Sequence, residues 1–297
     1  MDIKEIKKLK VGEVLEDINL KQYTTYKAGG IGKVLVIPNS INDLIKLLNY
    51  IKENKLKYKI LGFGSNLIFT NEVYDGILIK LDKLNDVKIE GTKITVGAGY
   101  SLIKLSLLAA KNDLAGLEFA SGIPGTVGGA VFMNAGAYKS DMGYIVTEIK
   151  VLTPDLEVKT MYNNELDFHY RTSFLQKNRD YVCLEATLVL YKGKKEAIMN
   201  VIRDRKLRRL ESQPLEYPSA GSVFRNPEGD FAGRLIEEIG YKGKQIGGAM
   251  VSTKHANFII NVGGATGKDI KKLITDIQEK IKKEYNIELK VEQEFVE

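Results

Sequence analysis

The sequence has one cysteine and two histidines among its 297 residues. The single cysteine, Cys183, excludes an internal disulfide and fits a reducing cytoplasm. Because it lies in the strand-like run YVCLEATLVL, we expect a small core residue and not a reactive thiol. So few histidine and cysteine side chains also leave zinc binding and a Ser-His-Asp triad without support. We therefore expect no metal site.

Long apolar runs and a concentrated basic surface are missing as well. No run approaches the roughly 18–20 apolar residues of a membrane span, and the charged start MDIKEIKKLKVGEVLED lacks the apolar core of a signal peptide. The net charge is +6, but the lysines are scattered without interleaved aromatic residues, which argues against a nucleic-acid face. The densest basic run, Arg203–Arg209, is expected to be the solvated face of an amphipathic helix. These patterns favour a cytoplasmic protein without nucleic-acid or membrane partners.

The length predicts two domains, each with its own core. Periodicity and capping residues predict helices near 3–9, 40–51, 101–112, 196–210 and 231–239 and from Thr266 onward, and strands near 29–38, 57–61, 77–81, 87–89, 94–96, 145–153, 158–161, 181–190, 249–251 and 258–262. The order strand, helix, strand over 29–61 predicts a parallel βαβ unit. The pattern changes after Gly193, so we expect a larger mixed domain over 1–200, with its core at about 28–192, and a smaller α+β domain over 201–297.

Glycine gathers in one stretch, Gly116–Tyr138, which reads GLEFASGIPGTVGGAVFMNAGAY and holds six of the chain's 28 glycines. Its only charged residue is Glu118, so it resembles buried backbone more than a solvated linker. Glycine suits positions of positive φ or close approach. Buried N–H and C=O groups need partners, and a bound polar ligand is one source of them. A glycine-rich turn between two core strands is the alternative.

A second loop, Gly62-Phe63-Gly64-Ser65-Asn66, directly follows the predicted strand near 57–61. Two glycines, a hydroxyl and an amide can direct successive backbone N–H groups at a diphosphate. The loop is not the Rossmann fingerprint, because Leu67-Ile68 stand where the third glycine would come. By itself this pattern leaves phosphate binding open.

A few isolated polar side chains could carry chemistry. Arg171 follows an aromatic residue, Ser222 lies in the apolar context Ala220-Gly221-Ser222-Val223-Phe224, and acidic residues stand near the end of the chain. Arginine can stabilise developing negative charge, serine can deliver a proton, and a carboxyl group can orient or polarise. For each of these residues, and for His169 and His255, a purely structural role is the alternative.

Together and in this order, the segments resemble the UDP-N-acetylenolpyruvoylglucosamine reductase (MurB) family. The matching segments cover nearly the whole chain and are TTYKAGG (Thr24–Gly30), LGFGSNLIF, Gly116–Tyr138, YRTSF, QPLEYPSAGSVFRNP, AGRLIEEIGYKGKQIGGAMVSTKHANFIIN and IELKVEQEF. The chain is similar to the shorter subtype of this family, whose substrate domain lacks an inserted tyrosine-bearing loop.

The resemblance implies an α+β fold in which an FAD-binding domain of the vanillyl-alcohol-oxidase/p-cresol-methylhydroxylase type precedes a smaller α+β substrate-binding domain. The last residues of the chain would return to the active site. By motif match, the diphosphate of FAD would be held by Gly62, Gly64, Ser65 and Asn66, the flavin end would be wrapped by Gly122, Ile123, Gly128, Gly129 and Ala130, and Thr25, Gly29 and Gly30 would help.

The implied activity is the NADPH-dependent reduction of UDP-N-acetylglucosamine enolpyruvate to UDP-N-acetylmuramate through FAD, in peptidoglycan precursor synthesis. In the family's mechanism NADPH passes hydride to flavin N5, and the hydride then goes to C3 of the enolpyruvyl group while C2 takes a proton. By motif match, Arg171 would stabilise the enolate, Ser222 would deliver the proton, Glu292 would assist that charge stabilisation, and Asn226, His255 and Asn257 would contact the substrate.

The last segment departs from the family pattern, which usually contains Pro-Glu-Val-Arg where this chain has Val291-Glu292-Gln293-Glu294. Counting from Leu289 favours Glu292 as the carboxylate, but Glu294 would share its face of a strand. Two other functions also stay open. One is another FAD-dependent oxidoreductase of the same fold acting on an alcohol or lactone; the other is a non-enzymatic module, such as a basic nucleic-acid or scaffold protein. We expect a monomer.

Relatives in the wider fold sometimes attach flavin to histidine or cysteine. Neither residue type occurs in Gly62–Asn66 or Gly116–Tyr138, so we predict that FAD is bound non-covalently. Acid precipitation of the purified protein should therefore release the yellow colour into the supernatant. Colour that remains with the precipitate would contradict this prediction.

Overall fold

The computed structural model describes residues 2–297 and has an α+β fold. The chain forms two compact units. The first unit comprises the described part of Met1–Glu16 together with Val34–Gly62 and Gly76–Leu207; the second comprises Asp17–Lys33, Phe63–Asp75 and Arg208–Glu297. Within the described residues, no helix combines the length and the apolar character that crossing a membrane requires.

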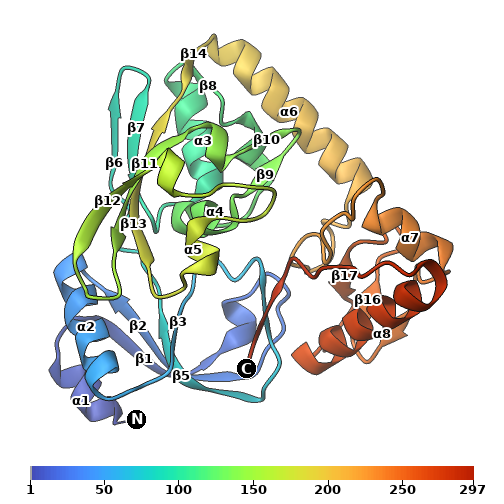
Figure 1. The fold of residues 1–297 in the computed structure, drawn as a ribbon, viewed down its shortest axis with the longest axis horizontal. Coiled ribbons are helices and arrows are strands. Elements are labelled where there is room, and N and C mark those ends of the chain that lie inside the picture. Colours follow the sequence, from blue (N-terminus) through green and yellow to red (C-terminus); the bar gives the residue numbers. More distant parts are fainter. Residues whose placement is uncertain (1) are drawn as a thin grey trace. The chain divides into compact units, whose positions relative to one another are not determined.

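An antiparallel five-stranded sheet forms the centre of the first unit (Figure 1), in the order β12-β11-β13-β7-β6. Its strands are β6 (Val87–Glu90), β7 (Lys93–Gly97), β11 (Val146–Leu152), β12 (Val158–Tyr162) and β13 (Val182–Val189). Ala186 of the central strand stands opposite Ile149 on one side and Val96 on the other. These three side chains are buried, so this register directs one face of the sheet into the core.

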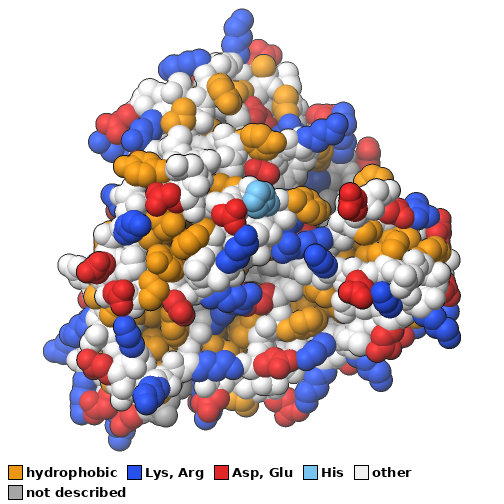
Figure 2. Space-filling model, in the orientation of Figure 1, with side chains coloured by type: hydrophobic (Ala, Val, Ile, Leu, Met, Phe, Trp, Pro, Cys, Tyr) orange, Lys and Arg blue, Asp and Glu red, His pale blue; other side chains and the backbone are white. Residues whose placement is uncertain are grey.

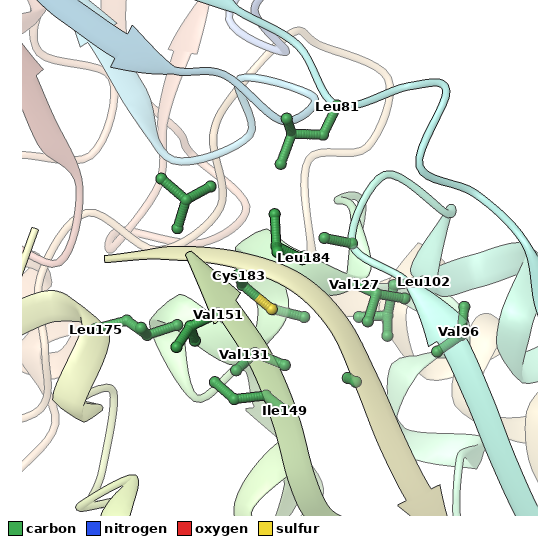
Figure 3. Packing of buried hydrophobic residues seen from close by; sticks show 14 of the residues in the cluster. Leu81, Val96, Leu102, Val127, Val131, Ile149, Val151, Leu175, Cys183 and Leu184 are labelled. Carbon is green, nitrogen blue, oxygen red and sulfur yellow. The ribbon is translucent and has the colours of Figure 1, made fainter. Parts of the chain in front are cut away.

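Two helices cover this core, α3 (Leu102–Lys111) and α4 (Val127–Met133). α4 packs against β13 and β7, and its side chains Val127 and Val131 are completely buried. Figure 3 shows these two residues close to Cys183, whose sulfur lies among aliphatic side chains. Burial raises the pKa of the Cys183 thiol to about 12. The prediction of an unreactive core cysteine is therefore confirmed.

A second sheet runs in the order β1-β2-β5-β3, with β1 (Gly12–Asn19), β2 (Ile31–Pro38), β3 (Tyr58–Ile60) and β5 (Val73–Ile79). β3 pairs with β5 in parallel. Ile31 N donates to Glu72 O, and Lys80 N donates to Val36 O. The residue numbers rise along both strands from the first bond to the second, which indicates that β2 and β5 are parallel too. The predicted βαβ unit is confirmed, with β5 inserted between its two strands.

Helix α2 (Ile41–Glu53) supplies the crossover of this unit. Ser40 caps its first turn by accepting a hydrogen bond from Asp43 N, as its position before an apolar periodic run predicts. Leu44, Leu47, Leu48 and Ile51 are buried on one face of the helix.

In the second unit, α7 (Ala232–Glu238) and α8 (Gly267–Tyr285) accompany a small antiparallel sheet of β15 (Gln245–Ile246), β16 (Ala249–Val251) and β17 (Ile259–Asn261). β18 (Glu294–Val296) pairs in parallel with β4 (Leu67–Phe69). The predicted inward face of α8 is confirmed: Ile270, Leu273, Ile274, Ile277 and Ile281 are all buried.

The long helix α6 (Lys195–Ser212) contributes residues to both units. The remaining, shorter elements are α1 (Ile3–Lys8), β8 (Leu114–Ala115), β9 (Gly136–Ala137), β10 (Ser140–Asp141), α5 (Phe174–Lys177), β14 (Tyr191–Lys192) and the 3-10 helices η1 (Leu20–Gln22), η2 (Glu118–Gly122), η3 (Met142–Tyr144) and η4 (Asn163–Glu165).

The structure adds elements that the sequence did not predict, among them β1, β4 and α4. β1 carries three acidic residues and is mostly solvent-accessible, so it lacks an apolar period. α4 begins with a pair of glycines, which disfavour helix unless tertiary packing stabilises it. The longest segment of the second unit starts at Arg208, and the unit also contains the two earlier segments Asp17–Lys33 and Phe63–Asp75. The division of the domains at 200/201 stays a proposal.

The cap of α8 provides a test of local stability. Thr266 accepts a hydrogen bond from Asp269 N, and the Asp269 carboxylate accepts one from Thr266 N. We expect Thr266→Ala to lower the free energy of unfolding by about 1 kcal/mol. Thr275→Ala is the matched control, because Thr275 is exposed inside the same helix, where alanine has the better helix propensity. Equal losses for both variants in urea denaturation would contradict the assigned cap.

Candidate active site

The loop that carries Ser222 is clamped by one buried asparagine. Asn257 Oδ1 accepts a hydrogen bond from Phe224 N at 2.9 Å, and Asn257 Nδ2 donates to Phe224 O at 2.8 Å. Val223 N donates to the backbone oxygen of Asn257 at 2.9 Å. Asn257 was predicted to contact the substrate, but its side-chain oxygen and nitrogen both form hydrogen bonds with the loop. Its direct contact with substrate stays a prediction.

The end of the chain runs beside the same loop. Glu292 N donates to Val223 O at 2.8 Å, and Val291 forms a β-bridge with Phe224. Glu292 is therefore adjacent to the residue that follows Ser222.

Glu294 lies in a different environment from Glu292. Glu294 N donates to Asn66 O at 2.8 Å, and Glu294 pairs with Leu67 of β4. Burial, with the negative charge of Glu294 as a second cause, raises the pKa of Tyr74 to about 12. Glu294 therefore lies near Tyr74, whereas the backbone of Glu292 joins the Ser222 loop.

A pocket of ≈ 380 Å³ opens beside Ser222 in the second unit. Its lining is formed by Ser222, Asn226, Phe231, Gly233, Arg234, Glu237, Lys242, Lys254, His255, Ala256 and Asn257. Three basic side chains face one acidic side chain in this lining. Lys242 pairs with Glu237 at 2.7 Å, and Lys254 Nζ donates to Leu210 O at 2.6 Å.

His255 belongs to this pocket and has a defined hydrogen-bond partner. Its Nδ1 lies 3.2 Å from Asn257 N, a donor, so Nδ1 accepts and the proton of the neutral ring is assigned to Nε2. The ring packs on Phe258 with 4.8 Å between centroids. Burial, together with the charge of Lys242, lowers the pKa of His255. His255 is therefore a neutral donor in the pocket lining.

Asn226 stands at the start of α7, where its Oδ1 accepts a hydrogen bond from Ala232 N at 3.1 Å. His169, in contrast, is 70% exposed, and its Nε2 lies 3.0 Å from Asp167 Oδ1. Of the two histidines, only His255 lines the pocket.

Arg171 belongs to the first unit and has an uncommon backbone conformation, with φ +54°. Its Nη2 donates to Gly136 O at 2.6 Å, and its own carbonyl accepts from Gln176 Nε2 at 3.0 Å. Burial raises the pKa of nearby Asp141, and the charge of Arg171 opposes that shift. The guanidinium is therefore held by backbone and flanked by a carboxylate.

Asn134 supports the Arg171 segment, and the sequence did not predict this role. It ends α4 with φ +42°, and its side chain is buried. Asn134 Nδ2 donates to His169 O at 2.9 Å, while its Oδ1 accepts from Gly143 N at 2.9 Å. An asparagine directly after an apolar run is a signal for a left-handed helix end, and it could have identified this residue.

In the glycine-rich stretch Gly116–Tyr138, backbone N–H groups at the start of α4 donate hydrogen bonds to acceptors within the protein. Val127 N donates to Tyr100 O, and Gly128 N to Ala98 O, both at 2.8 Å. Gly129 N donates to Thr126 Oγ1 at 3.2 Å. These three donors at the start of α4 need no ligand. Two further predicted residues lie just before the helix: Gly122 ends η2, and Ile123 follows it, partly buried.

The loop Gly62–Asn66 contributes to both units, because Gly62 ends one segment of the first unit and Phe63 begins a segment of the second. A Cβ added to Gly62 would lie 3.0 Å from Thr126 Oγ1, and one added to Gly129 would lie 3.3 Å from that atom. Within the first unit, Gly62 therefore lies beside the start of α4, which explains why a small residue is needed there.

The remaining predicted cofactor residues belong to the second unit. Gly64 has φ +62°, and an added Cβ would lie 2.1 Å from Tyr23 O; its carbonyl accepts from Thr25 N at 3.3 Å. Ser65 and Asn66 follow in a turn, partly buried. Gly29 has φ +133°, and a Cβ on Gly30 would lie 1.9 Å from Glu72 O. Backbone segments thus approach closely around this loop.

One hydroxyl beside this loop lacks a partner. Thr25 Oγ1 is buried and, within residues 2–297, has no hydrogen-bond partner. A buried polar atom without a partner carries a desolvation penalty, so native proteins seldom leave one unless a ligand or water satisfies it. Thr25 therefore has the properties expected of a residue that contacts a polar ligand.

Comparison with protein families defines the class of protein. Residues 32–162 match the family "FAD binding domain", and residues 213–296 match "UDP-N-acetylenolpyruvoylglucosamine reductase, C-terminal domain". The chain is an FAD-dependent oxidoreductase, as the sequence predicted.

Full-length relatives then define the family. The chain is 45% identical to the UDP-N-acetylenolpyruvoylglucosamine reductase of Halalkalibacterium halodurans, over 99% of this chain and 98% of that protein. It is also 45% identical to the enzyme of the same name from Bacillus subtilis, over 99% and 97%. The crystal structure of the Thermus caldophilus enzyme (MurB) superposes with a TM-score of 0.81 at 34% identity, covering 96% of this chain and 98% of that one. The chain belongs to the UDP-N-acetylenolpyruvoylglucosamine reductase family.

The residues present fit FAD. The unpartnered Thr25 hydroxyl and the left-handed Gly64 belong to the second unit, and Gly62 with the start of α4 belongs to the first. Of the residues predicted to react, Ser222 and Glu292 both belong to the second unit, where the backbone of Glu292 lies beside the Ser222 loop, while Arg171 belongs to the first. The individual roles of these residues remain predictions.

The Thr25 hydroxyl offers a test that separates binding from folding. We expect Thr25→Val to leave the apoprotein at least as stable as the wild type, because a buried, unpartnered hydroxyl is removed. FAD should bind about tenfold more weakly, the effect of losing roughly 1.4 kcal/mol of binding free energy. Calorimetric titration of apoprotein with FAD, together with urea denaturation, measures both quantities.

Thr24→Val is the matched control, because the Thr24 hydroxyl is buried and already donates to Ala28 O at 2.8 Å. This variant should lose about 1 kcal/mol of apoprotein stability and change FAD affinity less than Thr25→Val does. Wild-type affinity for FAD in Thr25→Val would exclude Thr25 as a contact.

Proposed function

We propose that this protein reduces UDP-N-acetylglucosamine enolpyruvate to UDP-N-acetylmuramate with NADPH, a step in peptidoglycan precursor synthesis. The observation that carries the proposal is similarity to reductases of this name along nearly the whole chain, joined to the Ser222 loop and its pocket. When bound, FAD accepts a hydride from NADPH and supplies it to C3 of the enolpyruvyl group.

Side chains of the protein then stabilise the negative charge that develops on the substrate and supply the proton that it takes up. Hydride addition to C3 breaks the C=C bond and places negative charge on an enolate that includes the carboxylate; C2 then takes a proton, which leaves a saturated lactyl ether. Arg171 stabilises that charge. A guanidinium already held by Gly136 O requires no reorganisation when charge appears.

Ser222 donates the proton to C2. Ser222 lines the pocket, and the two residues that follow it, Val223 and Phe224, are fixed by hydrogen bonds with Asn257 and Glu292. A serine is a weak acid in water, so the donation depends on a strongly basic enolate and on a fixed position close to C2. A proton from solvent restores the hydroxyl.

Glu292 assists the charge stabilisation at the enolate. The bond from its backbone to Val223 places it next to the Ser222 loop, whereas Glu294 lies near Tyr74 and β4. This difference in surroundings favours Glu292 over Glu294.

The pocket beside Ser222 receives the UDP-sugar. Lys242, Lys254 and Arg234 supply positive charge, and the Nε2–H of His255 and the side chain of Asn226 supply hydrogen-bond groups. A diphosphate is recognised by this combination of fixed charges and donors. Ion pairs with Glu237, Asp230 and Glu238 hold two of the cations in place.

We further propose that the enzyme works as a cytoplasmic monomer without nucleic-acid or membrane partners. Its substrate is a small charged nucleotide sugar, and both basic and acidic side chains occur on the face displayed in Figure 2. This mixture is unlike the single-sign surface that binds nucleic acid or anionic lipid.

The direct test is an assay of holoenzyme with NADPH and UDP-N-acetylglucosamine enolpyruvate. We expect one NADPH to be oxidised for each UDP-N-acetylmuramate formed, and no oxidation with UDP-N-acetylglucosamine, which lacks the enolpyruvyl group. Absence of product, with NADPH oxidised only by an alcohol or lactone substrate, would favour the other oxidoreductase function.

Single-turnover kinetics test the reacting residues. In Ser222→Ala, flavin reduction by NADPH should survive, while reoxidation by the substrate slows at least about a hundredfold, the lower range for loss of a general acid. Glu292→Gln should slow the same step, and Glu294→Gln should not. If only Glu294→Gln slowed reoxidation, the assignment of Glu292 would be wrong.

A further inference from the structure

The Gln293 side chain makes a concentrated set of contacts with the Ser222 loop. It is only 4% exposed, and its Nε2 lies 3.1 Å from Ala220 O, 3.3 Å from Gly221 O and 3.4 Å from Ser222 O. Two amide hydrogens thus face three successive carbonyl oxygens.

The orientation of this amide is fixed by its partners. Carbonyl oxygens only accept hydrogen bonds, so the nitrogen and not the oxygen must face the loop. Gln293 Oε1 accepts a hydrogen bond from the Tyr26 hydroxyl at 2.9 Å. Tyr26 is fully buried, and burial raises its pKa, so the hydroxyl stays protonated and remains a donor.

We propose that Gln293 is a positioning residue for the proton donor Ser222, and that its amide holds the loop Ala220–Ser222 beside Glu292. This inference rests on the proposed function. Glu292 N binds Val223 O at 2.8 Å, so two consecutive residues at the end of the chain hold the loop on both sides of the Ser222 hydroxyl.

The backbone of the loop Ala220–Ser222 needs the hydrogen bonds from Gln293 because it contains a flexible glycine. Gly221 has φ +75°, and apart from Gly221 itself and its two chain neighbours no heavy atom of the described residues lies within 4 Å of the site where its Cβ would be. Side-chain packing therefore does not restrain Gly221, and glycine is the most flexible residue type. Hydrogen bonds to the carbonyls of Ala220, Gly221 and Ser222 restrict that freedom. A shift of about 1 Å at a reacting group can slow a step about a hundredfold.

Two substitutions at Gln293 separate positioning from general stability. Gln293→Met retains the length and removes the donor. Gln293→Glu retains the shape but places a titratable oxygen against the carbonyls. The matched control is Gln278→Glu, because Gln278 Nε2 donates to one carbonyl of the same terminal segment, Leu289 O, at 2.8 Å and not to the Ser222 loop. Each holoenzyme is reduced with NADPH and then mixed rapidly with UDP-N-acetylglucosamine enolpyruvate across a range of pH.

In Gln293→Met we expect reoxidation by the substrate to slow at least about tenfold, with reduction by NADPH unchanged. In Gln293→Glu the rate should acquire a new dependence on pH. The protonated carboxyl can donate to one carbonyl, whereas the carboxylate repels all three, so the reoxidation rate should fall as pH rises through the pKa of that side chain. The groups that face or flank it are Tyr26, Glu292 and Glu294. Gln278→Glu should show the wild-type pH profile.

Wild-type reoxidation in both Gln293 variants would overturn the inference. Equal slowing of both half-reactions, or the same new pH dependence in Gln278→Glu, would also overturn it, since a purely structural role predicts those results. If neither Gln293 variant retains flavin, the same kinetics of Tyr26→Phe test the inference, because this variant removes only the hydroxyl that donates to Gln293 Oε1. Reoxidation slowed about threefold with normal reduction supports the inference, and unchanged reoxidation overturns it. If the wild type itself is not reoxidised by the substrate, the proposed function fails instead.

Discussion

Buried polar backbone must be hydrogen-bonded, and in this molecule the partners come from segments far away in the sequence. The loop Ala220–Phe224 passes through the core of the second unit with Val223 and Phe224 almost inaccessible to solvent. Its backbone groups bond to Asn257 and to the terminal residues Glu292 and Gln293. The position of the Ser222 loop therefore depends on two distant segments of the second unit, one around Asn257 and one at the end of the chain.

The first unit applies the same constraint to Arg171. Helix α4 is short and glycine-rich, so it depends on packing of Val127 and Val131 against the five-stranded sheet. The helix ends at Asn134, which bonds to the segment before Arg171, and the chain then reaches Gly136, whose carbonyl accepts the guanidinium. The packing of α4, which carries none of the predicted reacting side chains, thus helps to fix the position of the Arg171 guanidinium.

The sequence allowed prediction of those elements that have a strong local pattern. α8 combines a capping box with an apolar period, and Cys183 lies in a mostly apolar strand, so both were predicted correctly. The motif match to the family singled out Ser222 and Glu292, which the structure places in the pocket lining and beside the Ser222 loop; their roles stay predictions. α4 and β4 were missed because tertiary contacts, and not local propensity, stabilise them. The clamp by Asn257, the amide of Gln293 and the unpartnered Thr25 hydroxyl depend on three-dimensional proximity, which no spacing in the sequence encodes.

The central claim is that one bound flavin links NADPH to an enolpyruvyl UDP-sugar. The most direct measurement is the visible absorption spectrum of purified protein without oxygen, recorded after NADPH is added and again after UDP-N-acetylglucosamine enolpyruvate is added. The account predicts a flavin band that bleaches with NADPH and returns with the substrate, at a rate fast enough for turnover. A band that bleaches and stays bleached after the substrate is added, or a protein that neither contains nor acquires flavin, would contradict it.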